Sequence, residues 1–70
     1  MANLNREQFL QAMTDTYATV YPGADQDECA AEPKRILDNF LKDEKIEFGD
    51  VAYDWTACAA DTLVRELQDY

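Results

Sequence analysis

The chain has 70 residues, enough for a single domain, and 47% of them are hydrophobic, which is ordinary for a chain that folds. Fifteen Asp and Glu against six Lys and Arg give a net charge of −9, which excludes direct nucleic-acid binding and favours encounter with a basic partner. No apolar run approaches the ~20 residues of a membrane span and the N-terminus has no signal-peptide pattern, so we expect a cytoplasmic, acidic, helical domain over residues 1–70, with no membrane contact.

The first predicted element is a helix over residues 5–21. Asn5 followed by Gln8 has the pattern of a capping box, and Leu4 with Phe9 fits a hydrophobic staple. Apolar residues then recur at helical spacing, at Phe9, Met13, Tyr17, Val20 and Tyr21. Pro22-Gly23 predicts the end of the helix, because proline disfavours the helical conformation in the residue before it and glycine tolerates the turn.

A second helical segment begins near Asp25, which can cap it with Glu28 as its partner. Pro33 interrupts the segment, because a proline inside a helix costs about 3 kcal/mol unless it lies in the first turn. One interpretation is a short irregular turn over 26–31 and a new helix that Pro33 opens; the other is a single kinked helix. We favour the first, because proline suits the first position of a helix. The apolar face of this helix comprises Ile36, Leu37, Phe40 and Leu41.

An extended connector is predicted over 46–49, with Ile46 and Phe48 tucked under the bundle. Gly49-Asp50 then marks a turn and a new N-cap, so a third helix is predicted over about 51–68. Its apolar arc is wide and contains two neighbouring stripes: Val51, Trp55, Cys58, Ala59, Leu63 and Leu67, and Tyr53, Ala57, Ala60 and Val64. The alanines are small enough to let a neighbouring helix approach closely. The predicted fold class is therefore all-α, a small three-helix bundle with an irregular turn before Pro33 and an extended connector at 46–49.

The residue types that are missing narrow the chemistry. The chain has no histidine and no serine, so His-based acid–base catalysis, His metal ligation and serine hydroxyl chemistry are excluded. Asp25-Gln26-Asp27 starts like a calcium-binding loop, but Ala30 and Ile36 replace the glycine and glutamate that such a loop requires. Carboxylate pairs remain, but a chain this short rarely builds a cleft of the usual ligand volume. We therefore expect no enzyme, no catalytic residues, no metal and no cofactor.

The two cysteines, Cys29 and Cys58, lack the spacing of a metal site. We interpret them as two small buried hydrophobic residues. A disulfide between them, joining the second segment to the third helix, is the alternative.

The acidic surface is the one positive signal in the sequence. Asp50, Asp54 and Asp61 are expected on one side of the third helix. Further acidic candidates for partner binding crowd the beginning and the end of the second segment: Asp25, Asp27, Glu28, Glu32, Asp43, Glu44 and Glu47. Tyr53 and Tyr70 fall off the tightest apolar stripe and are the aromatic candidates for an interface. The alternative is a solvated surface that only keeps a small protein soluble.

The expected function is that of a non-enzymatic protein-binding domain whose acidic face engages a protein partner with a basic surface. Such a face can imitate the phosphate array of a nucleic acid and inhibit a nucleic-acid-handling complex. In size and charge alone, the chain is similar to small acidic proteins of phages and mobile elements, including anti-CRISPR and anti-restriction proteins. The alternative function is a structural or assembly subunit that binds a partner through an apolar helix face. The wide apolar arc of the third helix also makes homodimerisation a hypothesis.

Overall fold

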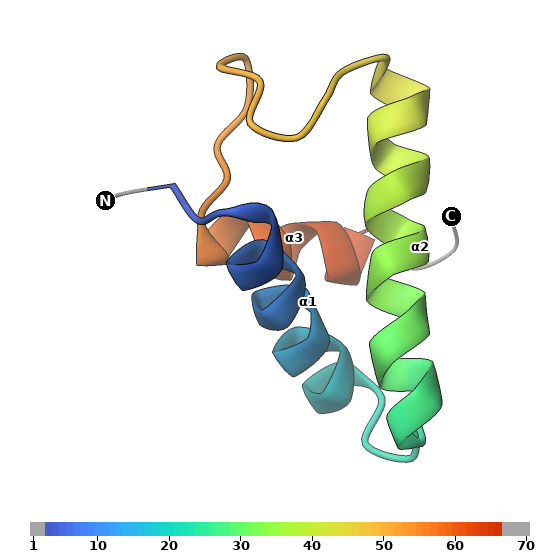
Figure 1. The fold of residues 1–70 in the computed structure, drawn as a ribbon. Helices are drawn as coiled ribbons and strands as arrows, with labels where there is room; N and C mark the ends of the chain where they lie inside the picture. The colour runs from blue at the N-terminus through green and yellow to red at the C-terminus, as the bar shows by residue number, and fades with distance from the viewer. Residues whose placement is uncertain (1–2, 67–70) are drawn as a thin grey trace.

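The computed structural model describes residues 3–66, which form three α-helices and no strand. The helices are α1 (Arg6–Val20), α2 (Gln26–Glu44) and α3 (Ala57–Glu66). Figure 1 shows α1 and α2 diverging from the short turn that joins them, with α3 crossing the space between them. The larger of the two contact surfaces of α3 is with α1, although these helices lie furthest apart in the chain. The predicted all-α, three-helix bundle is confirmed.

Helix α1 begins and ends close to the predicted positions. The Asn5 side chain accepts the backbone N–H of Gln8 at 2.8 Å, and Gln8 Oε1 accepts the backbone N–H of Asn5 at 3.0 Å, so the capping box is complete. Phe9, Met13 and Tyr17 are its buried residues. The sequence signals for this helix are local, and nothing in the tertiary structure overrides them.

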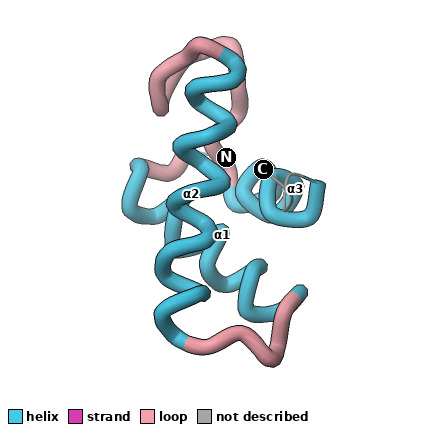
Figure 2. The backbone as a smooth tube through the Cα atoms, turned by 90° about the vertical axis from the view of Figure 1, so that its right-hand side faces the viewer, coloured by secondary structure: helices cyan, strands magenta, loops and turns pink. Residues whose placement is uncertain are grey.

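Helix α2 runs without interruption through Pro33, so the preferred prediction of an irregular turn over 26–31 is wrong and the single-helix alternative is right. Both views of the chain show it as one continuous helix (Figures 1 and 2). Pro33, Ile36, Leu37 and Phe40 share one buried face, so the proline ring adds to the core. The Asp25 side chain caps the first turn, and the ion pair between Glu32 and Arg35 spans the proline. These contacts offset the hydrogen bond that the proline nitrogen cannot donate.

Helix α2 ends in a Schellman motif at Lys45. The backbone N–H groups of Lys45 and Ile46 donate to the carbonyls of Lys42 and Leu41 at 3.3 and 3.1 Å. This places Lys45 in the left-handed region, with φ 58° and ψ 43°, where an L-residue with a Cβ is strained. The backbone at this residue is therefore suited to glycine.

The substitution Lys45→Gly should raise the free energy of unfolding by up to about 1 kcal/mol, because glycine adopts the left-handed conformation without the Cβ clash. Chemical denaturation measures the change. The control is Lys42→Gly in the last turn of α2, which should lower stability by about 1 kcal/mol. Equal losses in both variants would contradict the role of the backbone conformation at Lys45.

The connector, which we define as residues 45–56, is longer than predicted, and α3 begins at Ala57 and not near residue 51. Asp50 organises the connector through three hydrogen bonds. Its carboxylate accepts the N–H of Ala52 at 2.9 Å. Its backbone carbonyl accepts the N–H of Tyr53 at 3.2 Å and the indole Nε1–H of Trp55 at 2.9 Å. Asp50 thus caps a turn, as aspartate does in competition with helix. Thr56 caps α3, because its Oγ1 accepts the N–H of Ala59 at 3.3 Å.

The core lies between the three helices and the connector. Its buried residues are Phe9, Met13, Tyr17, Ile36, Leu37, Phe40, Trp55, Ala60, Leu63 and Val64. Ile46 and Phe48 pack against it from the connector, as predicted. Phe48 contacts the rings of Phe9 and Trp55, with centroid separations of 5.4 and 4.5 Å. None of the helices in residues 3–66 is long and apolar enough to cross a membrane.

Candidate partner-binding surface

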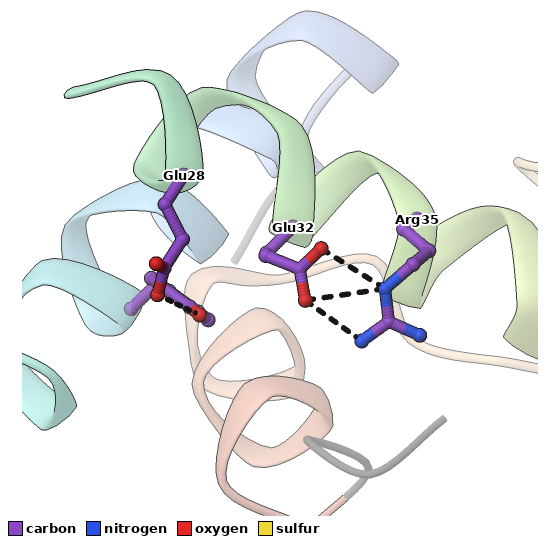
Figure 3. Close-up of polar contacts among 4 residues, drawn as sticks. Glu28, Glu32 and Arg35 are labelled. Carbon is purple, nitrogen blue, oxygen red and sulfur yellow. Dashed lines mark hydrogen bonds and ion pairs between the residues drawn. The ribbon is translucent and has the colours of Figure 1, made fainter. Parts of the chain in front are cut away.

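The first group of predicted site residues lies at the beginning of α2 and comprises Asp25, Asp27, Glu28 and Glu32, which we name the N-terminal acidic cluster. The Asp25 side chain is occupied as the helix cap, since it accepts the N–H of Glu28 at 2.8 Å. The carboxylates of Glu28 and Glu32 are also engaged (Figure 3). Glu28 Oε2 accepts a hydrogen bond from the hydroxyl of Tyr17 at 2.7 Å. Both carboxylate oxygens of Glu32 accept hydrogen bonds from the guanidinium of Arg35. Asp27 is exposed and has no partner among residues 3–66. The structure therefore brings the four acids together, but only Asp27 is free of a local role.

The contact between Tyr17 and Glu28 gives α1 and α2 a pH-dependent link. Burial, and then the hydrogen bond to the Glu28 carboxylate, raise the pKa of the Tyr17 hydroxyl above its usual value near 10. The neutral phenol is thus favoured by the folded state. Stability from this group is complete below about pH 10 and is lost as the pH rises further, because the unfolded chain then releases a proton that the folded chain retains.

The substitution Tyr17→Phe should lower the free energy of unfolding by about 0.5–1.5 kcal/mol at neutral pH, because phenylalanine has no hydroxyl to donate to the Glu28 carboxylate. It should also reduce the loss of stability that the parent chain shows between about pH 8 and about pH 11, since phenylalanine does not titrate. Urea denaturation at both pH values measures the two effects. The prediction is wrong if Tyr17→Phe and the parent lose stability to the same extent on the alkaline side.

The second group lies where α2 ends and the connector begins, and contains Asp43, Glu44 and Glu47, all exposed. Lys42 and Lys45 line the same shallow surface as Asp43, so positive charge accompanies these acids. Glu44 Oε1 accepts the hydroxyl of Tyr53 at 2.9 Å. Glu47 has no side-chain partner among residues 3–66. Charge at this end of the domain is therefore mixed, with Glu47 as its unengaged acid.

The structure does not bring Asp50, Asp54 and Asp61 onto one side of a helix, so that prediction is wrong. Asp50 and Asp54 belong to the connector, and only Asp61 lies on α3. Asp50 holds the turn described above, and Asp61 is bound to Arg65 and to the Thr16 hydroxyl. Asp54 is exposed and has no partner within the part of the chain that the structure describes. The error follows from the start of α3, which lies six residues later than predicted.

Of the two tyrosine candidates, Tyr53 lies on the connector and Tyr70 lies outside the described residues. The Tyr53 side chain is 36% exposed, and its ring packs edge-on against Phe40 with centroids 5.4 Å apart. The hydrogen bond to the Glu44 carboxylate, with a smaller effect of burial, raises the pKa of the Tyr53 hydroxyl. Tyr53 is thus held in place and still accessible.

An apolar groove opens beside Tyr53, between α2, the connector and α3, with a volume of about 540 Å³. Residues from all three parts line it: Phe40, Tyr53, Asp54, Trp55, Thr56, Cys58, Ala59, Thr62, Leu63 and Glu66. Its size falls within the roughly 300–1,000 Å³ of ligand sites, which a chain this short rarely builds. Connector residues 53–56 form part of its wall, beside residues of α2 and α3.

The sequence prediction missed most of the groove. Phe40 and Leu63 were assigned to the core alone, and Cys58 was interpreted as buried, whereas it is exposed at the start of α3. Cys29 is partly buried, and both cysteines are free thiols, so the alternative of a disulfide between them is also wrong. Thr56 as the cap of α3 was the signal that could have placed Cys58 in the first turn of the helix.

Residues 3–66 contain no cluster of three or more metal-ligating side chains. No family model matches the chain, and neither a curated protein nor a solved structure is similar to it at a significant level. The described surface therefore offers a partner exposed negative charge beside an apolar groove.

Proposed function

We propose that this chain is a non-enzymatic, cytoplasmic protein-binding domain whose acidic surface engages a basic surface of a partner protein. That partner surface is of the kind that grips nucleic-acid phosphates, so the bound domain takes the place of the nucleic acid and inhibits a nucleic-acid-handling complex. The similarity to small acidic phage and mobile-element inhibitors in size and charge is consistent with this role.

The observation that carries the proposal is that the acidic side chains of residues 3–66 are exposed or only partly buried. No charged side chain in residues 3–66 is buried. All three arginines are already bound to acids of the same chain, in the pairs Arg6–Asp38, Arg35–Glu32 and Arg65–Asp61. The remaining basic residues are three lysines on or next to α2: Lys34, Lys42 and Lys45. The arginines neutralise only three of the acids, so the surface keeps an excess of negative charge, which favours rapid, salt-sensitive association with a basic partner.

The alternative of an assembly subunit that binds through an apolar face of the third helix has less support. Ala60, Leu63 and Val64 are buried inside the domain, and Val51 and Tyr53 do not belong to the helix. The apolar surface that α3 leaves exposed is therefore narrower than the sequence predicts. This also weakens the main reason for expecting a homodimer.

The test is a pull-down from host lysate at about 50 mM and about 200 mM salt, with the captured proteins quantified. The bait variant is the double substitution Asp27→Asn and Glu47→Gln, which removes two acids that have no partner among residues 3–66. Its matched control is Gln26→Ala with Asn39→Ala, which changes two exposed side chains of α2 without changing charge. We expect basic partners whose capture falls about tenfold or more with salt, and falls with the charge variant but not with the control.

A second measurement addresses inhibition. A captured partner that binds nucleic acid should release it when the domain is added in excess, because both occupy one basic surface. Partners retained equally at both salt concentrations and by both variants would contradict an electrostatic interface. A partner that holds nucleic acid and the domain together would contradict the mimicry.

A further inference from the structure

The groove between α2, the connector and α3 combines two kinds of surface. Its interior is formed by rings and aliphatic groups, including Phe40, Trp55 and Leu63. Two exposed acids, Asp54 and Glu66, lie on its lining, and no basic residue lines it. No other described residue forms a hydrogen bond or ion pair with the Asp54 carboxylate. An occupant of this groove must therefore bring an apolar group and positive charge together.

We infer that the groove seats one apolar side chain of a basic, amphipathic segment of the partner, with Lys or Arg residues beside that anchor contacting Asp54 and Glu66. Apolar anchors in grooves, flanked by charge at the rim, are a recurring mode of peptide recognition. This inference rests on the proposed function, because it takes the partner to be basic. It adds where the partner docks and which residue type gives the contact its specificity.

Charge argues against the other occupants. A second copy of this chain also carries a net charge of −9, so it would bring acids against the acidic rim. The segment 67–70, which follows α3 in the sequence, includes Asp69 and no basic residue, so it is also negative. A small molecule is disfavoured because the lining includes exposed residues such as Tyr53, Cys58 and Thr62, whereas ligand sites bury most of the ligand surface.

The probe is a synthetic helical peptide of about 14 residues made of Lys and Ala, with one Leu in its centre as the anchor. A second peptide has Ser in place of the Leu and the same charge. Calorimetry gives the affinities, and amide chemical shifts of the labelled domain give the location. We expect the Leu peptide to bind about tenfold or more tightly than the Ser peptide and to shift the amides of residues 53–66 most strongly.

The groove variant is Thr62→Arg, which places a bulky positive group at an exposed position of the lining. Thr19→Arg is its matched control: Thr19 is exposed on α1 away from the groove, and both threonine hydroxyls donate to the carbonyl four residues earlier, at 3.0 and 3.1 Å. Thr62→Arg should weaken the Leu peptide about tenfold or more, and Thr19→Arg should weaken it only slightly. The double variant Asp54→Asn and Glu66→Gln removes the rim charge without touching the core, and should also weaken binding.

Each outcome distinguishes the groove from the wider proposal. Equal affinity of the Leu and Ser peptides, with shifts at Asp27 or Glu47 in place of the groove, overturns the groove and leaves the acidic surface as the binding site. Failure of both peptides to bind, even at low salt, overturns the groove and contradicts the proposed function as well. Sedimentation that shows a dimer abolished by Thr62→Arg overturns the inference in favour of a second copy.

Discussion

Replacing Trp55 with alanine is expected to remove a large part of the domain's free energy of unfolding at room temperature. The Trp55 side chain is only 2% exposed and contacts the rings of Phe9, Phe48 and Tyr53. Truncation of a buried tryptophan to alanine costs about 3–5 kcal/mol, through the lost transfer free energy and the cavity that remains. A domain of this length is stable by about 4–10 kcal/mol, so the loss consumes much of its stability. Circular dichroism during urea or thermal denaturation measures the effect.

Two further variants make this prediction specific. Val51→Ala should leave stability within about 0.5 kcal/mol of the parent, because the Val51 side chain is fully exposed on the connector. Trp55→Phe retains a buried ring but loses the hydrogen bond from Nε1 to the Asp50 carbonyl, and should fall between the two. Val51 and Trp55 belong to one stripe if a helix begins near residue 51. Comparable losses in both alanine variants would therefore favour the longer helix over the connector.

Replacing Ala60 with leucine is expected to lower the free energy of unfolding by about 1–3 kcal/mol. Ala60 is completely buried on α3, which packs more extensively on α1 than on α2. Its small side chain permits close approach of the helices. Added methylene groups must displace neighbours or force the helices apart, because protein interiors are close-packed. Urea denaturation gives the change directly.

The matched control is Ala57→Leu in the same helix. Ala57 is exposed in the first turn of α3, so the larger side chain extends into solvent and stability should change by less than about 0.5 kcal/mol. Leucine and alanine have similar helix propensities, so the comparison isolates packing from backbone preference. Destabilisation by Ala57→Leu equal to that by Ala60→Leu would contradict the observed face of α3.

The sequence predicts best the features that are decided locally. The capping box at Asn5, the regular apolar stripe after it and the Pro22-Gly23 ending all act within a few residues, and α1 follows them closely. Pro33 misled the prediction because the local rule against proline in a helix is outweighed by tertiary contacts. Its ring lies on the buried face of α2, and burial is a property of the whole fold.

The error at the third helix has a different cause. Val51 and Trp55 have helical spacing, so periodicity alone favours a helix, but the Asp50 carboxylate binds the backbone two residues later and stabilises a turn. The connector is also held by a contact distant in sequence, because the backbone carbonyl of Trp55 accepts the N–H of Leu4 at 2.7 Å. That partner lies at the other end of the chain. No pattern within a window of a few residues contains it.

The candidate site was predictable in composition and not in arrangement. Abundant exposed acids follow from the net charge, and the N-terminal acidic cluster follows from the start of α2. The grouping of Asp54 with Phe40 and Leu63 around one groove depends on the path of the connector. Because residues 51–56 of the connector are predicted as helix, the contribution of the connector to the groove cannot be predicted from the sequence.

The packing of α3 mainly on α1 also determines when the chain can fold during synthesis. The ribosome produces α1 first, but α3, which packs on it more extensively than α2 does, is synthesised only after α2 and the connector. Until α3 emerges, Phe9 and Met13 have only α2 and the connector to pack against. The nascent chain therefore exposes part of the hydrophobic surface of α1 until α3 has been synthesised, and the domain then completes its core in one cooperative step.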